Sequence, residues 1–384
     1  MALIDFKVLP GIDKQDTASG AEFRWVDCNN TRFRYGLPEK VGGWSSLVTD
    51  TIVGVARREF AFVDLDGNRY VAIGTDKFLL IYFEGQLYDI TPLKTTLTSA
   101  TLATTDTSAI CSITTGTNHN LSVGDIVLLD TVTLPVGTGY VDADFENKLF
   151  QVTSITSATV FTITQSTAAT ATVGTGGSLS VKPYEQVGPA EQSYGYGWGI
   201  DTWSSGKWGE AASASDVSLE PGLWSLSNFG QVLVATIANG KTFTWNAGDA
   251  ARLTTRASTA TSGFETTNNP TATRITLVSP TTRHLIHLGT ETTIGDPTTQ
   301  DDMFIRFSDQ EDINDYVPTA INSAGSQRLQ DGTRIIGALK AKESILVWTD
   351  NALYTMKFIG APFTFGFEQV GTNCGLIGKN AAIE

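Results

Sequence analysis

Basic residues are scarce in this sequence of 384 residues, which carries 26 Lys and Arg against 40 Asp and Glu, a net charge of −14. Proteins that clamp DNA or RNA gain their affinity from clustered Lys and Arg, which displace counterions from the phosphates. The charge balance therefore excludes an ordinary nucleic-acid-clamping protein.

Cysteine and long apolar runs are also scarce. The first nine residues include Asp5 and Lys7, where a secretory signal needs uninterrupted apolar residues. No run approaches the roughly 20 apolar residues of a membrane span. We expect a soluble chain, made in a reducing cytoplasm and without membrane insertion. The three cysteines are odd in number and far apart, so they predict free thiols: Cys28, Cys111 and Cys374.

The residues that are abundant favour an all-β protein. The chain is 41% hydrophobic, holds 37 Gly and shows no sustained helical periodicity. Residues 60–90 predict four short strands, with hairpin turns at Asp66-Gly67 and Glu84-Gly85. Similar phrases recur at 223–245, 283–307 and 334–358. Repeats of four short antiparallel strands are typical of propeller blades, so we expect a β-propeller-like domain.

A Thr-rich stretch interrupts these repeats. Residues 149–164 predict a hairpin, and His119–Asp125 predicts a turn that feeds the strand IVLLD. We therefore expect residues 1–92 to hold an N-terminal segment and the first blade, 93–186 an inserted small β-barrel or β-sandwich, and 187–384 the remaining blades. A disordered Thr-rich linker is the alternative for 93–186.

The segment 193–210 is rich in Gly and aromatics and has no periodic pattern. Its aromatic side chains either fill grooves of the propeller or meet another subunit, since loop aromatics are favoured interface anchors. The candidate subunit-interface residues are Tyr194, Tyr196, Trp198, Trp203 and Trp208.

Signals for catalysis or metal binding are weak. His284 and His287 are three apart, so in a strand they face opposite sides and predict core or surface histidines. His119 has no Cys or Asp nearby in sequence that would form a catalytic triad with it. Asp64–Asn68 resembles the start of a calcium loop, but the twelfth position is Thr75 instead of Glu, and a type I′ hairpin turn explains the segment better.

An acidic run follows at residues 309–315. Four carboxylates in seven residues suit either a Ca²⁺ or acid/base site, or a solvated turn. The solvated turn is the expected role, so the run becomes a candidate acidic surface or lumen, made of Asp309, Glu311, Asp312 and Asp315. No motif for a nucleotide, metal or nucleophile is present. We expect no cofactor, no metal and no enzymatic activity.

Eight short segments, which we call phrases, follow one another along the chain: Pro10–Thr17, Arg32–Trp44, Arg69–Thr75, Leu87–Pro92, Trp224–Gly230, Phe307–Asp309, Asp331–Arg334 and Leu346–Tyr354. Taken in this order, they resemble the tail nozzle or tail hub proteins of short-tailed double-stranded-DNA bacteriophages. The turn His119–Asp125 is also similar to small β modules of phage tail proteins.

The resemblance implies a structural virion protein in the tail, assembled in the host cytoplasm as a homohexamer. The ring would attach below the portal and its adaptor, meet a needle, plug or fibre protein below, and conduct the genome during ejection. Six copies at −14 each give −84, and an acidic wall repels phosphate, so double-stranded DNA would pass without tight binding.

Two points qualify the resemblance. Members of that family usually continue through further blades, whereas this sequence stops at a strand-like phrase, so we expect a C-terminally incomplete propeller or a different closure. The alternative function is a carbohydrate-binding or carbohydrate-cleaving propeller, with Asp309, Glu311 or Asp312 as acids and exposed tryptophans as sugar platforms.

Overall fold

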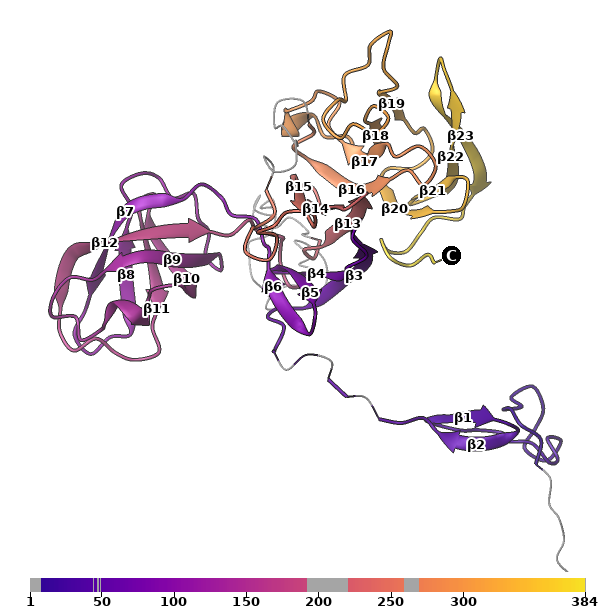
Figure 1. Cartoon of the computed structure of the whole chain (residues 1–384), viewed down its shortest axis with the longest axis horizontal. Coiled ribbons are helices and arrows are strands. Elements are labelled where there is room, and N and C mark those ends of the chain that lie inside the picture. The colour runs from indigo at the N-terminus through magenta and orange to yellow at the C-terminus, as the bar shows by residue number, and fades with distance from the viewer. Residues whose placement is uncertain are drawn as a thin grey trace, which may run out of the picture. The chain divides into compact units, whose positions relative to one another are not determined.

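The computed structural model describes residues 8–43, 45, 46, 48, 50–191, 220–258 and 269–383. The chain divides into two compact units, residues 1–49 and 50–384. The described residues form strands, turns and two 3-10 helices, Asp142–Asp144 (η1) and Pro297–Thr299 (η3), without an α-helix (Figure 1). The expected all-β class is confirmed.

The first unit is built around a two-stranded hairpin. Strands β1 (Thr31–Arg34) and β2 (Leu37–Lys40) pair antiparallel across the two-residue turn Tyr35-Gly36. Both turn residues have positive φ, 51° and 81°, as the twist of a tight hairpin requires. Strand β1 carries two basic residues, Arg32 and Arg34, and Arg32 bonds Glu39 at 3.2 Å between Nε and Oε2.

The second unit contains four antiparallel sheets whose strands follow one another in chain order. Sheet 1 is β3 (Ala56–Val63), β4 (Arg69–Thr75), β5 (Leu79–Phe83) and β6 (Gln86–Asp89). Sheet 2 is β13 (Trp224–Phe229), β14 (Val232–Ile237) and β15 (Thr242–Asn246). Sheet 3 is β16 (Thr273–Val278), β17 (Leu285–Thr290), β18 (Phe304–Phe307) and β19 (Gly325–Arg328). Sheet 4 is β20 (Ile335–Lys340), β21 (Ile345–Thr349), β22 (Ala352–Gly360) and β23 (Thr364–Thr372).

These sheets are the expected propeller-like repeats, although sheet 2 has three strands among the described residues instead of the expected four. Most of their turns lie where the sequence predicts them. The turn Glu84-Gly85 has φ of 47° and 88°, the values of a two-residue hairpin. The expected type I′ turn at Asp66-Gly67 is wrong, because the connection runs from residue 64 to 68. Its shape is fixed by the Asp64 carboxylate, which accepts the amides of Asp66 at 3.0 Å and Asn68 at 2.8 Å.

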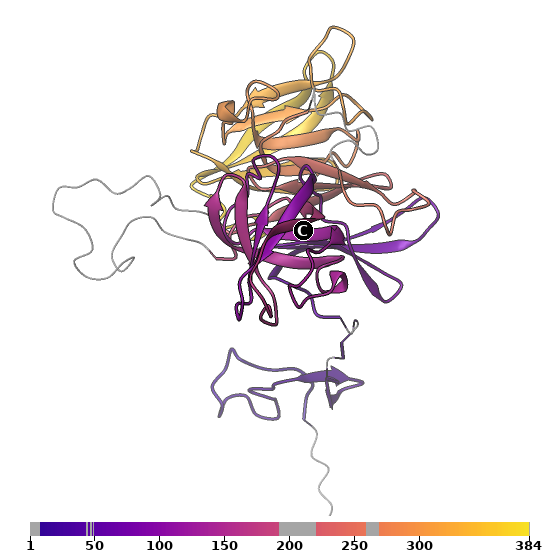
Figure 2. The same cartoon turned by 90° about the vertical axis from the view of Figure 1, so that its left-hand side faces the viewer.

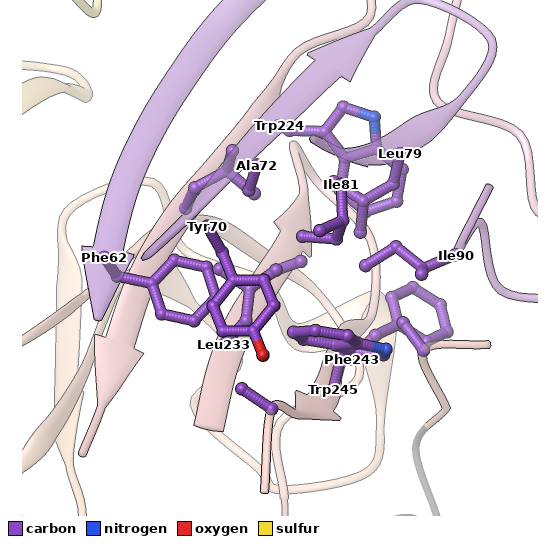
Figure 3. Packing of buried hydrophobic residues seen from close by; sticks show 14 of the residues in the cluster. Phe62, Tyr70, Ala72, Leu79, Ile81, Ile90, Trp224, Leu233, Phe243 and Trp245 are labelled. Atoms are coloured by element: carbon purple, nitrogen blue, oxygen red, sulfur yellow. The ribbon is translucent and has the colours of Figure 1, made fainter. Parts of the chain in front are cut away.

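The sheets are joined by apolar layers between neighbours. Figure 3 shows the layer between sheets 1 and 2, where Tyr70 meets the Trp245 ring edge-on at 5.6 Å between centroids. Trp224 packs against Gly74, where an added Cβ would fall 2.7 Å from Cδ1 of the indole ring. Two further layers join sheet 2 to sheet 3 and sheet 3 to sheet 4.

A closed barrel stands in the chain between sheets 1 and 2. Its strands are β7 (Leu97–Thr104), β8 (Ile110–Thr114), β9 (Ile126–Thr133), β10 (Lys148–Ser157), β11 (Val160–Thr164) and β12 (Val173–Pro183). They close in the order β10-β11-β8-β7-β12-β9 around an apolar interior. Figure 2 shows these purple and magenta strands on the side that faces the viewer. Closure removes the exposed strand edges that favour aggregation. The boundaries 93–186 of a separate domain stay a prediction.

The two ends of the barrel segment lie together. The Lys94 amide donates to the Pro183 carbonyl at 2.8 Å, and Leu93 bridges Tyr184. The Tyr184 hydroxyl donates to Asp89 at 2.7 Å, and Arg256 donates to the same carboxylate at 2.9 Å. The segment thus leaves and re-enters the sheets at one point.

Candidate functional site in the central cleft

The first strands of the four sheets surround a cleft of about 230 Å³. Strands β3, β13, β16 and β20 each contribute wall residues, and residues 379–382 close the gap between sheets 4 and 1. Arg58 of β3 donates to Asn380 Oδ1 at 2.8 Å. This bond ties the C-terminal segment, whose end is marked C in Figure 1, to sheet 1. We call this space the central cleft.

The polar groups of the cleft wall are mainly donors and hydroxyls. Lys340 Nζ lies 2.9 Å from Ser227 Oγ, and Ser225 Oγ donates to the Thr276 carbonyl at 2.9 Å. The rest of the wall is mostly apolar, including Trp224. Among the described residues that line the cleft, no side chain is a carboxylate.

Further basic residues surround one carboxylate in an adjoining pocket, which shares Leu223, Arg274, Lys379 and Asn380 with the central cleft. We call this adjoining pocket the mouth of the cleft. Glu220 accepts from Arg274 at 3.0 Å and from Arg334 at 2.6 Å, and Lys379 Nζ lies 3.7 Å from it. Arg274 also bonds Asp302 at 3.1 Å. Burial opposes the charge on Glu220, but the nearby cations outweigh it and hold the pKa of Glu220 below its ordinary value.

The cleft and its mouth together gather six cations: Arg57, Arg58, Arg274, Arg334, Lys340 and Lys379. The carboxylates paired with them among the described residues are Glu220 and Asp302. A chain of net charge −14 therefore holds a local excess of positive charge.

Burial and nearby positive charge lower the pKa of both lysines of the cleft, Lys340 and Lys379. Burial, helped by the charge of Arg58, lowers the pKa of Lys340 to about 8. Burial and the charge of Arg274 lower the pKa of Lys379 to about 8, although Glu220 opposes the shift. Perturbed titratable groups in a cleft are typical of functional sites.

The acidic run lies elsewhere, in the connection between β18 and β19. Asp309 accepts the Ser323 amide at 2.7 Å, and Asp315 accepts Asn322 Nδ2 at 2.8 Å. Burial opposes the charge on Asp309, but hydrogen bonds from Ser323 hold the pKa of Asp309 below its ordinary value.

The remaining two acids of the run are exposed. Asp312 Oδ1 accepts the Asn314 amide at 2.8 Å, and Glu311 faces Arg283 at 3.7 Å. The run therefore shapes its own loop, and none of its four carboxylates lines the central cleft. Their assignment to a ring lumen stays a prediction.

The histidines have structural partners. His287 Nδ1 lies 3.1 Å from Thr273 Oγ1 and its Nε2 lies 3.0 Å from Tyr316 Oη. Burial and the charge of Arg306 lower the pKa of His287 to about 3. His284 contacts Thr282 Oγ1 at 2.7 Å. Within the part of the chain that the structure describes, no group of three metal-ligating side chains occurs.

The candidate interface aromatics fall on residues 192–219, outside the described residues. Sequence reasoning missed the central cleft, because its cations come from six separate positions between 57 and 379. One signal was available: Arg58, Arg274 and Lys340 all lie on the first strand of a repeat.

Comparison with known proteins gives little beyond this geometry. No family model matches the chain, and no curated protein matches it. Among solved structures, a phage phi92 endosialidase aligns at 14% identity, with a TM-score of 0.25. The alignment covers 80% of this chain and 48% of that one. No helix in the described ranges has the length and apolar character needed to span a bilayer.

One sequence-based expectation is corrected by this match. We expected a chain without enzymatic activity, and that expectation is wrong as stated, because a solved structure with which the chain aligns is named as an enzyme. At a TM-score of 0.25 the likeness carries no argument for a particular activity.

Proposed function

We propose that this protein is a structural part of the tail of a short-tailed double-stranded-DNA bacteriophage. In this proposal it forms the nozzle, a homohexameric ring below the portal and its adaptor through which the genome leaves. The observation that carries the proposal is the series of sequence segments between Pro10 and Tyr354 that, taken in order, resemble tail nozzle or tail hub proteins. The phrase Arg69–Thr75 forms β4 of sheet 1, and Leu346–Tyr354 falls on β21 and β22 of sheet 4.

The distribution of charge supports passage of DNA without capture. Four of the 26 basic residues line the central cleft, so fewer remain for the outer surface: Arg58, Arg274, Lys340 and Lys379. A cleft of about 230 Å³ is far smaller than a duplex. An outer surface enriched in carboxylates repels phosphates over roughly a Debye length, about 8 Å at physiological ionic strength.

The proposal assigns tasks to two sets of residues. Tyr194, Tyr196, Trp198, Trp203 and Trp208 would contact the neighbouring subunit. The exposed acids Glu311 and Asp312, with Asp309 and Asp315, would face the passing DNA. The adaptor would bind above the ring and a needle, plug or fibre protein below it.

Fluorescence anisotropy with labelled duplex DNA tests the conduction part of this proposal. The full chain should not bind the duplex at low salt, at about 20 mM, nor at about 0.15 M. A Glu311→Lys/Asp312→Lys variant should show measurable binding at the lower salt only, because the new cations release phosphate counterions. Tight binding of wild-type protein at 0.15 M salt would refute passive conduction.

A further inference from the structure

We propose that the central cleft binds a small tetrahedral oxyanion, either free phosphate or the phosphoryl group of a small molecule. The inference does not depend on the proposed ring, because all of the groups involved come from one chain. It rests on the donors that meet in the cleft, on the charges there and on the size of the space.

Lys340 and Ser227 form the first half of the site. Ser227 is buried at 1% exposure, and its Oγ accepts from Lys340 Nζ at 2.9 Å and from the Val278 amide at 3.2 Å. Because the oxygen already accepts twice, its own hydrogen is left to donate to a third group. A donating hydroxyl beside an ammonium is a suitable pair for a phosphate oxygen.

Arg58 and Asn380 form the second half. Arg58 Nη1 donates to Asn380 Oδ1 at 2.8 Å. An Arg has five N–H donors, and this carboxamide oxygen takes one of them. Because the carboxamide oxygen of Asn380 accepts from Arg58, the NH₂ group of Asn380 is the part of this side chain that can donate to an anion. Both residues line the cleft, as Lys340 and Ser227 do.

Unlike Arg274 and Lys379, the cleft cations Arg58 and Lys340 form no ion pair with a carboxylate among the residues described. Arg58 and Lys340 are close enough for the charge of one to lower the pKa of the other. The carboxylates nearby, Glu220 and Asp302, pair with Arg274 instead. Holding two cations together in a largely apolar wall is costly, and an anion between them would offset that cost.

The size of the cleft selects among anions. Pockets for drug-sized ligands occupy about 300–1,000 Å³, whereas this cleft has about 230 Å³. A single phosphate-sized group fits such a space and a nucleic-acid duplex does not. Cations at its wall and mouth also disfavour a metal ion.

Titration of Lys340 makes anion binding in the cleft depend on pH. With a pKa of about 8, Lys340 is mostly protonated at neutral pH and mostly neutral above pH 9. Arg58 of β3, Arg274 of β16 and Lys379 of the C-terminal segment are the charged groups that face it from other elements. Anion binding should therefore weaken as the pH rises through about 8.

Thermal unfolding of the full chain tests the site. Phosphate should raise the melting temperature of wild-type protein saturably, by about 2 °C or more at about 10 mM, over chloride at matched ionic strength. Lys340→Met should lose this rise. Lys342→Met, an exposed lysine on the same hairpin, should keep it and so correct for general salting-out by phosphate.

Calorimetric titration of the wild-type protein tests phosphate binding even if a variant fails to fold. Wild-type protein should bind inorganic phosphate with a stoichiometry of one per chain, and Arg58→Gln should weaken binding at least about tenfold. Glycerol phosphate in place of phosphate distinguishes a phosphoryl group from the free ion. Absence of heat with both ligands, or an equal and unsaturable temperature rise in wild type, Lys340→Met and Lys342→Met, would overturn the proposal.

Discussion

At the scale of single residues, the most informative side chains are the basic ones. They are few, yet Arg58, Lys340 and Lys379 lie at the cleft instead of spreading over the surface. The net charge of the chain therefore indicates that its outer surface repels anions such as DNA, but it does not predict that the cleft attracts an anion.

Lys340 makes the stability of the protein depend on pH. Its pKa is lowered from 10.5 to about 8, so between these values the unfolded chain holds more protons than the folded one. The free energy of unfolding should therefore rise as the pH rises through this window. In Lys340→Met the rise should shrink to the part that belongs to Lys379, and the variant should be more stable than wild type near neutral pH. Denaturant unfolding at about pH 7.5 and about pH 9.5 measures this, and parallel changes in both proteins would contradict it.

Gly74 allows sheets 1 and 2 to pack closely. A Cβ at this position would lie 2.7–2.9 Å from atoms of Trp224, whose indole N–H donates to the Thr75 carbonyl at 3.0 Å. Gly74→Ala should destabilise the protein by about 1–3 kcal/mol through overpacking. Gly116→Ala is the matched control, since its Cβ would meet nothing within 4 Å. Chemical denaturation compares the two, and equal stability would refute this packing.

At the scale of elements, alternation and turn residues predicted most strands of the sheets. Glu84-Gly85 and Asn239-Gly240 lie at turns, where Gly85 and Asn239 have positive φ, a conformation that Gly and Asn adopt more readily than other residues. The loop at Asp64 differs from the predicted type I′ turn. Its shape depends on a carboxylate that accepts two loop amides, and the identity of the turn residues alone does not predict those hydrogen bonds. The cleft was not predictable, because closure by Asn380 is a contact between residues 322 positions apart.

The barrel should be removable from the sheets. The Lys94 amide and the Pro183 carbonyl are 2.8 Å apart, so a short Gly/Ser linker can replace residues 95–182. The variant should keep one cooperative melt, lowered because Phe78 and Leu80 lose their contacts with β9. Circular dichroism melting tests this, and loss of cooperativity would show that the sheets need the barrel.

Residues 1–49 should not fold alone. Ala21 is the buried hydrophobic residue that the structure describes in this unit, whereas Tyr35 is 91% and Leu37 70% exposed. A unit this small with so little core lacks the burial to outweigh chain entropy. A peptide of residues 1–49 should show no cooperative melt by circular dichroism, and a sharp transition would contradict this expectation.

At the scale of the whole molecule, the two proposals give the acidic surface and the cationic cleft different roles. The surface would keep DNA moving through a ring, and the cleft would hold a small anion within each subunit. A change in one need not alter the other, because Glu311 and Asp312 belong to the loop between β18 and β19 and do not line the cleft.

Single-particle electron microscopy of the full chain tests the central claim of a nozzle most directly. The account predicts rings of six subunits with a central opening wide enough for duplex DNA. Monomers at concentrations up to tens of micromolar, or a closed assembly too narrow for a duplex, would contradict it.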